Sequence, residues 1–120
     1  MLQKFEFDYD GENDNLFLFD RKRKSNRSVS YGKNITFDLT NRNEFAGLEF
    51  RDARKVLGNL AKRDFSRKDL EQVSKAKLQV EQMGGIAFVK IYLSIHTEEG
   101  EEEIPATITI SAKNRIGAFS

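Results

Sequence analysis

Hydrophobic and polar residues alternate near the start of the chain, where Phe5, Phe7 and Tyr9 are separated by acidic residues. This period of two is typical of a half-buried strand. Residues 16–19 are apolar at every position, which predicts a strand covered on both faces. Further short strands are predicted at the next apolar runs, residues 29–31, 35–39 and 45–50. We therefore expect an antiparallel meander in the first half.

Helical spacing replaces this alternation in the middle of the chain. Asp52 is a favoured N-cap residue, and Val56, Leu57 and Leu60 follow it on one face of a helix. Residues 66–69 read Ser-Arg-Lys-Asp and approximate a capping box, which predicts the start of a second helix.

The last third predicts two hairpins whose strands share an apolar face. A two-residue turn at Gly84 and Gly85 gives the pairs Met83 with Ile86, Val80 with Val89, and Leu78 with Ile91. A turn around Glu99 and Gly100 gives the pairs Ile95 with Ile104, Leu93 with Ala106, Ile91 with Ile108, and Val89 with Ile110. A slip of one residue would expose the whole aliphatic set.

Together these elements predict an α+β fold, in which a mostly antiparallel sheet of short strands and hairpins has the two central helices packed on one face. A chain of 120 residues fits a single domain, residues 1–120, with a sizeable core. We expect it to contain an N-terminal half of about residues 1–62. A helix with a three-stranded antiparallel extension should follow at about residues 63–112.

Two blocks of the first half resemble a known family. The first runs from Tyr9 and Asp10 through an acidic turn to Asp14 and the sequence Leu-Phe-Leu at 16–18; the second is Gly-Leu-Glu-Phe at 47–50, followed by Asp-Ala at 52–53. Over about residues 5–60 the chain resembles the YuzE-like family of small soluble domains. The resemblance implies a fold but no activity, because the family's biochemical role is unassigned. The strand-rich C-terminal extension is similar to longer members of that family.

The composition limits the cellular compartment and the kinds of reactive site that we expect. The chain has no Cys, so it has no disulfide, thiol nucleophile or thiolate metal site. Neither a signal peptide nor a membrane-spanning run is recognisable. We therefore expect a cytoplasmic protein that makes no membrane contact.

Candidate chemistry is sparse. Acidic residues at 8, 10, 12 and 14 have a calcium-loop spacing, but neither register supplies the glycine and the final acid that such a loop needs, so we expect no metal. The lone His96 is predicted to lie opposite Glu103, which is more typical of a surface pair than of a general base. No phosphate loop or nucleophile motif accompanies them. We expect no catalytic residue and no cofactor.

Charge is distributed unevenly. Residues 1–20 hold one lysine against six acids, residues 21–77 sixteen cations against seven acids, and residues 78–120 three cations against six acids. Five of the seven residues at 21–27, the basic loop, are cationic. Such patches attract phosphate, although solvated loops have the same composition. The candidate nucleic-acid-binding residues are Arg21, Lys22, Arg23, Lys24 and Arg27, with Arg54, Lys55 and Lys62 from the first helix.

These features favour a non-enzymatic binding or interaction module whose partner is unknown, either another protein or a second copy in a homo-oligomer. An alternative is nucleic-acid (RNA) binding through the basic loop and the central basic helices. A further alternative comes from the resemblance, because such proteins are sometimes thought to accompany toxin-like ribonucleases. In that case the chain would be an antitoxin-like inhibitor that covers a basic surface with the acids of residues 8–14 or 98–103.

Overall fold

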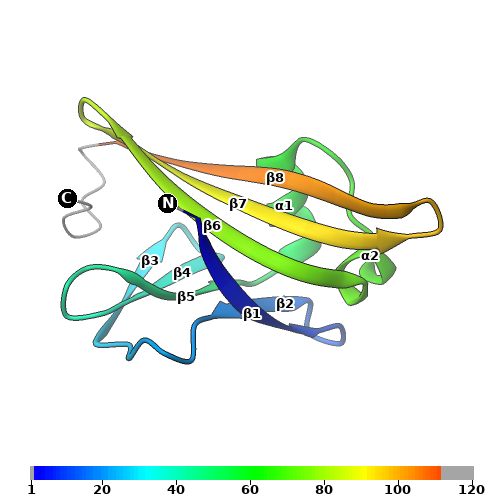
Figure 1. Ribbon diagram of the computed structural model, residues 1–120, viewed down its shortest axis with the longest axis horizontal. Helices are drawn as coiled ribbons and strands as arrows, with labels where there is room; N and C mark the ends of the chain where they lie inside the picture. Colours follow the sequence, from blue (N-terminus) through cyan, green and yellow to red (C-terminus); the bar gives the residue numbers. More distant parts are fainter. Residues whose placement is uncertain (1, 112–120) are drawn as a thin grey trace.

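The computed structural model describes residues 2–111, which form one curled, eight-stranded antiparallel sheet and two short helices (Figure 1). In chain order the elements are β1 (Gln3–Asp10), β2 (Asn15–Phe19), β3 (Arg27–Tyr31), β4 (Ile35–Leu39), β5 (Phe45–Phe50), α1 (Ala53–Ala61), α2 (Arg67–Glu71), β6 (Val73–Met83), β7 (Ile86–Thr97) and β8 (Gly100–Ser111). The strand order across the sheet is β3-β4-β5-β2-β1-β6-β7-β8. Residues 1 and 112–120 of the predicted single domain lie outside the described residues.

The fold is predominantly β, so the predicted α+β class is wrong. Strands hold 58% of the described residues and helices 13%. The helices also do not cover one face of the sheet: α1 contacts β8 and β5 and lies behind β7 and β8 in Figure 1, whereas α2 contacts β7 and lies beside the start of β6. The physical reason is that β6, β7 and β8, with 11 or 12 residues each, themselves curl over the inner face that the helices were expected to cover.

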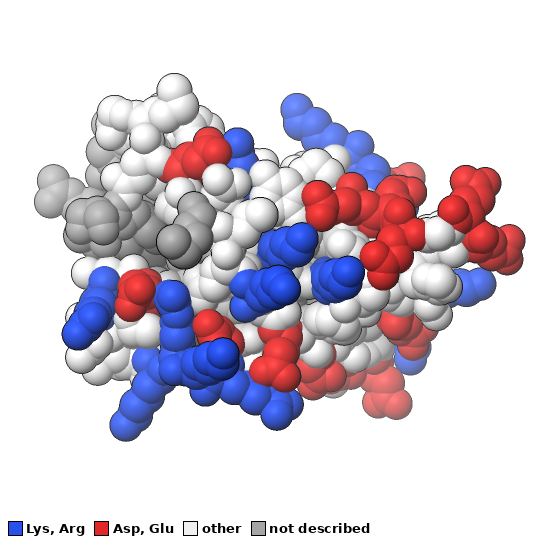
Figure 2. Space-filling view, viewed as in Figure 1, with Lys and Arg blue, Asp and Glu red and all other residues white. Residues whose placement is uncertain are grey.

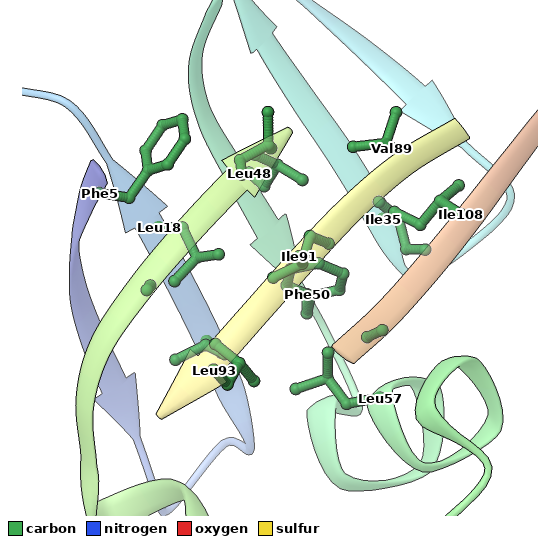
Figure 3. Close-up of a cluster of buried hydrophobic side chains, with 14 of the residues drawn as sticks. Phe5, Leu18, Ile35, Leu48, Phe50, Leu57, Val89, Ile91, Leu93 and Ile108 are labelled. Carbon is green, nitrogen blue, oxygen red and sulfur yellow. The ribbon is translucent and has the colours of Figure 1, made fainter. Parts of the chain in front are cut away.

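The hydrophobic core lies between two parts of this sheet, the N-terminal part (β1–β5) and the C-terminal part (β6–β8). Figure 3 shows side chains of β2 and β5 facing side chains of β7 and β8, with one residue of α1 at the end of the cluster. Its fully buried members include Leu18, Phe50, Leu57, Ile91 and Ile108. Because residues of both parts fill one interior, neither part has a core of its own.

The C-terminal part confirms one predicted register and corrects the other. β6 and β7 pair as predicted, with Met83 opposite Ile86 and Leu78 opposite Ile91. Between β7 and β8 the observed pairs are shifted by two residues, so that Ile95 lies opposite Glu102 and not Ile104. The shift arises because the chain turns at Glu98 and Glu99, one residue earlier than expected. A shift by an even number keeps every side chain on its predicted face.

The N-terminal part is not a simple meander, because β2 pairs with β5 and not with β3. The basic loop carries the chain to the far edge of the sheet, and β3, β4 and β5 return toward β2. Gly47 allows this approach, since a Cβ there would lie 2.8 Å from the carbonyl oxygen of Leu18. β2 is also not covered on both faces: Leu16 and Leu18 are buried, whereas Phe17 points outward and is 36% exposed.

The two parts of the sheet join at a short ladder between β1 and β6. Gln3, Lys4 and Phe5 pair with Leu78, Lys77 and Ala76, respectively. We call this ladder the seam. Beyond Phe5, β1 continues its pairing with β2, while β6 remains paired with β7, so the strands separate there. Among the described residues, neither helix is long and apolar enough to cross a membrane.

Candidate functional site

The basic loop is partly neutralised by its surroundings. Its three arginines contact acidic or polar partners, namely Glu6 for Arg21 at 3.0 Å, Asp20 and Glu44 for Arg23 at 3.5 Å each, and Asn43 for Arg27. Lys22 and Lys24 are exposed and have no ion pair with any described residue. The loop is therefore less free to take up an anion than its composition indicates.

The structure separates the predicted helix cations from this loop. Arg54, Lys55 and Lys62 line a hollow of about 680 Å³ beside α1. Figure 1 shows α1 behind β7 and β8, away from the connection between β2 and β3 at the lower left, and the hollow beside α1 shares no lining residue with the hollow beside the basic loop. In the α1 hollow, four cations face three carboxylates, so its charge is nearly balanced. The eight predicted cations therefore do not form one site.

Asp14 builds the junction between the β1–β2 turn and α1. Its buried carboxylate accepts hydrogen bonds from the Tyr9 hydroxyl at 2.6 Å and from the Arg54 backbone N–H at 3.2 Å. The carboxylate also lies 3.4 Å from the Arg54 guanidinium. Burial, together with the hydrogen bond to Asp14 and the charge of that residue, raises the pKa of Tyr9 to about 12. These contacts hold the helix in place and leave Asp14 little capacity for a ligand.

This junction also revises the predicted capping of α1. Asp52 occupies the N-cap position, but its backbone is left-handed, with φ 51°, and its side chain makes no capping hydrogen bond. Asp14 supplies that bond from a distant part of the sequence. At α2 the predicted capping box is confirmed, since Ser66 and Asp69 exchange side chain to backbone hydrogen bonds.

A basic groove opens beside the seam. It consists of two adjoining hollows of about 440 Å³ each, which share Lys4, Phe5 and Glu6 of β1. The first is also lined by Lys75 and Lys77, and the second by cations of the basic loop, Arg21 and Lys22. We call the two hollows the seam groove. Five cations line it against two carboxylates, Glu6 and Asp20, so it is far less balanced than the α1 hollow.

Two lysines of the seam groove lie directly opposite each other. Lys4 and Lys77 are cross-strand partners, and neither forms an ion pair with a described residue. Lys75 has one weak pair, 3.9 Å from Glu101. Figure 2 shows cations over the middle of this outer face and, as a larger group, at the end that carries the basic loop. Like charges directly opposite each other destabilise a sheet, so an anion bound here would relieve an existing repulsion.

The candidate residues predicted from the sequence do not include Lys4, Lys75 and Lys77. A signal was present for two of them, because Lys4 precedes Phe5 and Lys77 lies between two apolar residues, so both are expected to point outward from a strand. The alternation does not show that β1 pairs with β6, which brings together residues more than 70 positions apart in the sequence. A basic site assembled from separate segments has no local motif.

The predicted pairing of His96 with Glu103 is wrong. His96 is exposed, and it lies opposite Glu101 in the sheet. The Glu101 carboxylate accepts a hydrogen bond from the Ser74 hydroxyl at 2.9 Å and is the partner of Lys75. The shift of the β7–β8 register by two residues explains the difference.

Acidic residues of the two predicted acidic turns form hydrogen bonds and ion pairs within the protein. Hydrogen bonds from the Asn13 side chain and backbone hold the pKa of the exposed Asp10 carboxyl below its usual value, and Glu12 adds a third donor. At the other acidic turn, Glu102 pairs with Arg63. Across residues 2–111, no three potential metal ligands are grouped so that they could hold an ion.

Comparison with protein-family models, curated proteins and solved structures gives no match for this chain. The resemblance to the YuzE-like family, and the antitoxin role that it suggests, therefore stay predictions. The seam groove and its unbalanced charges are the features of this chain that point to a function.

Proposed function

We propose that this protein is a non-enzymatic binding module that holds the phosphate backbone of a nucleic acid in the seam groove. The observation that carries the proposal is the opposition of Lys4 and Lys77, which have no ion pair among the described residues. Such a pair costs stability in the free protein and becomes favourable when a phosphate lies between the ammonium groups.

The neighbouring charges support the same ligand. Lys22 and Lys75 extend the cationic lining on both sides of β1, so several phosphates of one backbone can be contacted in succession. Arg21 forms an ion pair with Glu6 at 3.0 Å. An exposed ion pair of this kind is weak, so Arg21 can leave Glu6 and bind a phosphate. The proposed site thus keeps Arg21 and Lys22 of the basic loop and adds three lysines of the sheet.

The test compares two triple variants with the same loss of charge. Lys4→Gln, Lys75→Gln and Lys77→Gln remove the sheet cations of the seam groove, while Arg54→Gln, Lys55→Gln and Lys62→Gln remove those of the α1 hollow. Binding of a labelled oligonucleotide is measured by fluorescence anisotropy from low to high salt. We expect the seam variant to bind more weakly. The slope of log affinity against log salt concentration should be lower by about 2 to 3, because binding releases fewer counterions when three phosphate contacts are lost.

The α1 variant should bind like the wild type. An equal loss in both variants would show that net charge, and not the seam groove, is responsible. Absence of binding by the wild type at low salt would overturn the proposal.

A further inference from the structure

Four aromatic side chains lie on the outer face of the sheet and not in the core. Phe17 and Phe19 belong to β2, and Phe88 and Tyr92 belong to β7. None of the four belongs to the buried core or to the side chains packed against it. An aromatic ring that the fold does not need for packing is available to contact a ligand.

The charges around these rings differ sharply. Phe17 lies between two acids, Asp8 on β1 and Glu49 on β5. Tyr92 lies directly across from Lys77, in one row with Lys4. Its outward neighbours on the same strand are Ser94 and Lys90, and Lys90 pairs with Glu81 at 3.1 Å. A negatively charged strand is therefore repelled from Phe17 and attracted to Tyr92.

The surroundings of Tyr92 leave its ring accessible from outside. The residue is half-buried, and its partner on β8 is the exposed Pro105, which adds a flat apolar surface beside the ring. The Tyr92 hydroxyl makes no hydrogen bond with any residue in the described range 2–111. Tyr9 and Tyr31, by comparison, donate to Asp14 and to the Thr109 carbonyl, and thus serve the fold.

We propose that the preferred ligand is single-stranded nucleic acid, with one unpaired base stacked on Tyr92 while adjacent phosphates lie over Lys77 and Lys4. This inference rests on the proposed function and names its ligand class. Bases in a duplex are stacked on one another and cannot stack on a protein ring, whereas unpaired bases can. The row from Lys4 through Lys77 to Tyr92 supplies both the phosphate contact and the stacking surface that single strands use.

The experiment uses three labelled probes of equal length, a single strand, a duplex and a strand without bases, at one low salt concentration. The wild-type protein should bind the single strand more tightly than the strand without bases. Tyr92→Leu should reduce single-strand affinity by about 5-fold to 150-fold, the range found when a stacking ring is lost, and leave binding to the baseless strand unchanged. Tyr92→Phe, which retains a ring, should keep the wild-type affinity.

Phe17→Leu is the matched control, because it removes an exposed ring flanked by acids and should change no affinity. Since the protein has three tyrosines and no tryptophan, quenching of tyrosine emission on binding gives a second readout, which Tyr92→Leu should lose. Unchanged binding of baseless strand by Tyr92→Leu also shows that this variant is folded.

The inference is overturned, with the proposed function intact, if all three probes bind the wild type equally and Tyr92→Leu has no effect. If no probe binds the wild type, both the proposed function and this inference fail.

Discussion

The two parts of the sheet differ in where their strands find partners. In the C-terminal part, β6 pairs with β7 and β7 pairs with β8, each through a short turn. In the N-terminal part the strands have five to eight residues, and β2 and β1 also pair with the distant β5 and β6. Turns and face alternation therefore determine the C-terminal part, whereas contacts between remote segments determine the N-terminal part and the seam groove.

The largest expected effect tests whether the two parts nevertheless unfold together. Phe50→Ala in β5 and Ile91→Ala in β7 each remove a fully buried side chain of the shared core. We expect a loss of about 3–5 kcal/mol for Phe50→Ala and about 2–5 kcal/mol for Ile91→Ala. Amide hydrogen exchange, read separately in β4 and β7, should show the same loss of protection in both strands. Retained protection of β7 in Phe50→Ala would show that the parts are separate cooperative units.

A second, smaller effect tests the remote cap of α1. Asp14→Asn should destabilise the protein by about 1–3 kcal/mol, because the buried carboxylate loses charge and part of its capacity to accept hydrogen bonds. Asp52→Asn is the matched control, since Asn tolerates the left-handed backbone and no capping bond is lost; its effect should stay within about 0.5 kcal/mol. Urea denaturation measures both. Equal effects would mean that Asp52 caps the helix locally after all.

A third prediction concerns the seam, where stability and binding should oppose each other. Lys4→Glu replaces two like charges by an opposite pair and should raise the stability by about 0.2–1 kcal/mol. The same change should weaken oligonucleotide binding. Lys33→Glu, in an exposed turn, changes net charge equally and should leave stability nearly unaltered. If Lys4→Glu lowers the stability, then repulsion at the seam is not significant.

The last effect is absent at neutral pH and appears only in alkali. The pKa of Tyr9 is raised from 10.0 to about 12, chiefly by burial and then by Asp14, so the folded state retains the phenolic proton more firmly than the unfolded state. This contribution is fully present below pH 10 and is lost as the pH rises toward 12. The unfolding free energy of the wild type should therefore fall more steeply over that interval than that of Tyr9→Phe. Parallel curves for the two proteins would contradict the assignment.

The local pattern predicts the C-terminal part well. Gly84 and Gly85 gave the correct register for β6 and β7, and alternation placed the aliphatic residues of β8 on the correct face even though the pairing was shifted by two. The fold class was wrong because residues 52–72 form two helices of nine and five residues, too short to cover a sheet. Helix propensity and capping residues indicate where a helix begins, but not which surface covers the core.

The candidate site was predicted only in part. Arg21 and Lys22 line the seam groove, whereas Arg54, Lys55 and Lys62 lie at a separate, nearly balanced hollow. Charge along a sequence does not show whether an arginine is already paired, as Arg23 is with Asp20 and Glu44. It also does not show that Lys4 lies opposite Lys77, because that depends on pairing across most of the chain.

The core that the two parts of the sheet share has a consequence for synthesis on the ribosome. β5 is complete at residue 50, but the strands that cover its inner face are complete only at residue 111. At translation rates of about 5–20 residues per second, this interval lasts roughly 3 to 12 s. During that time Leu18, Phe37 and Leu48 have no partners from β7 and β8. The nascent N-terminal part thus exposes an apolar surface to which chaperones can bind until β7 and β8 have been synthesised.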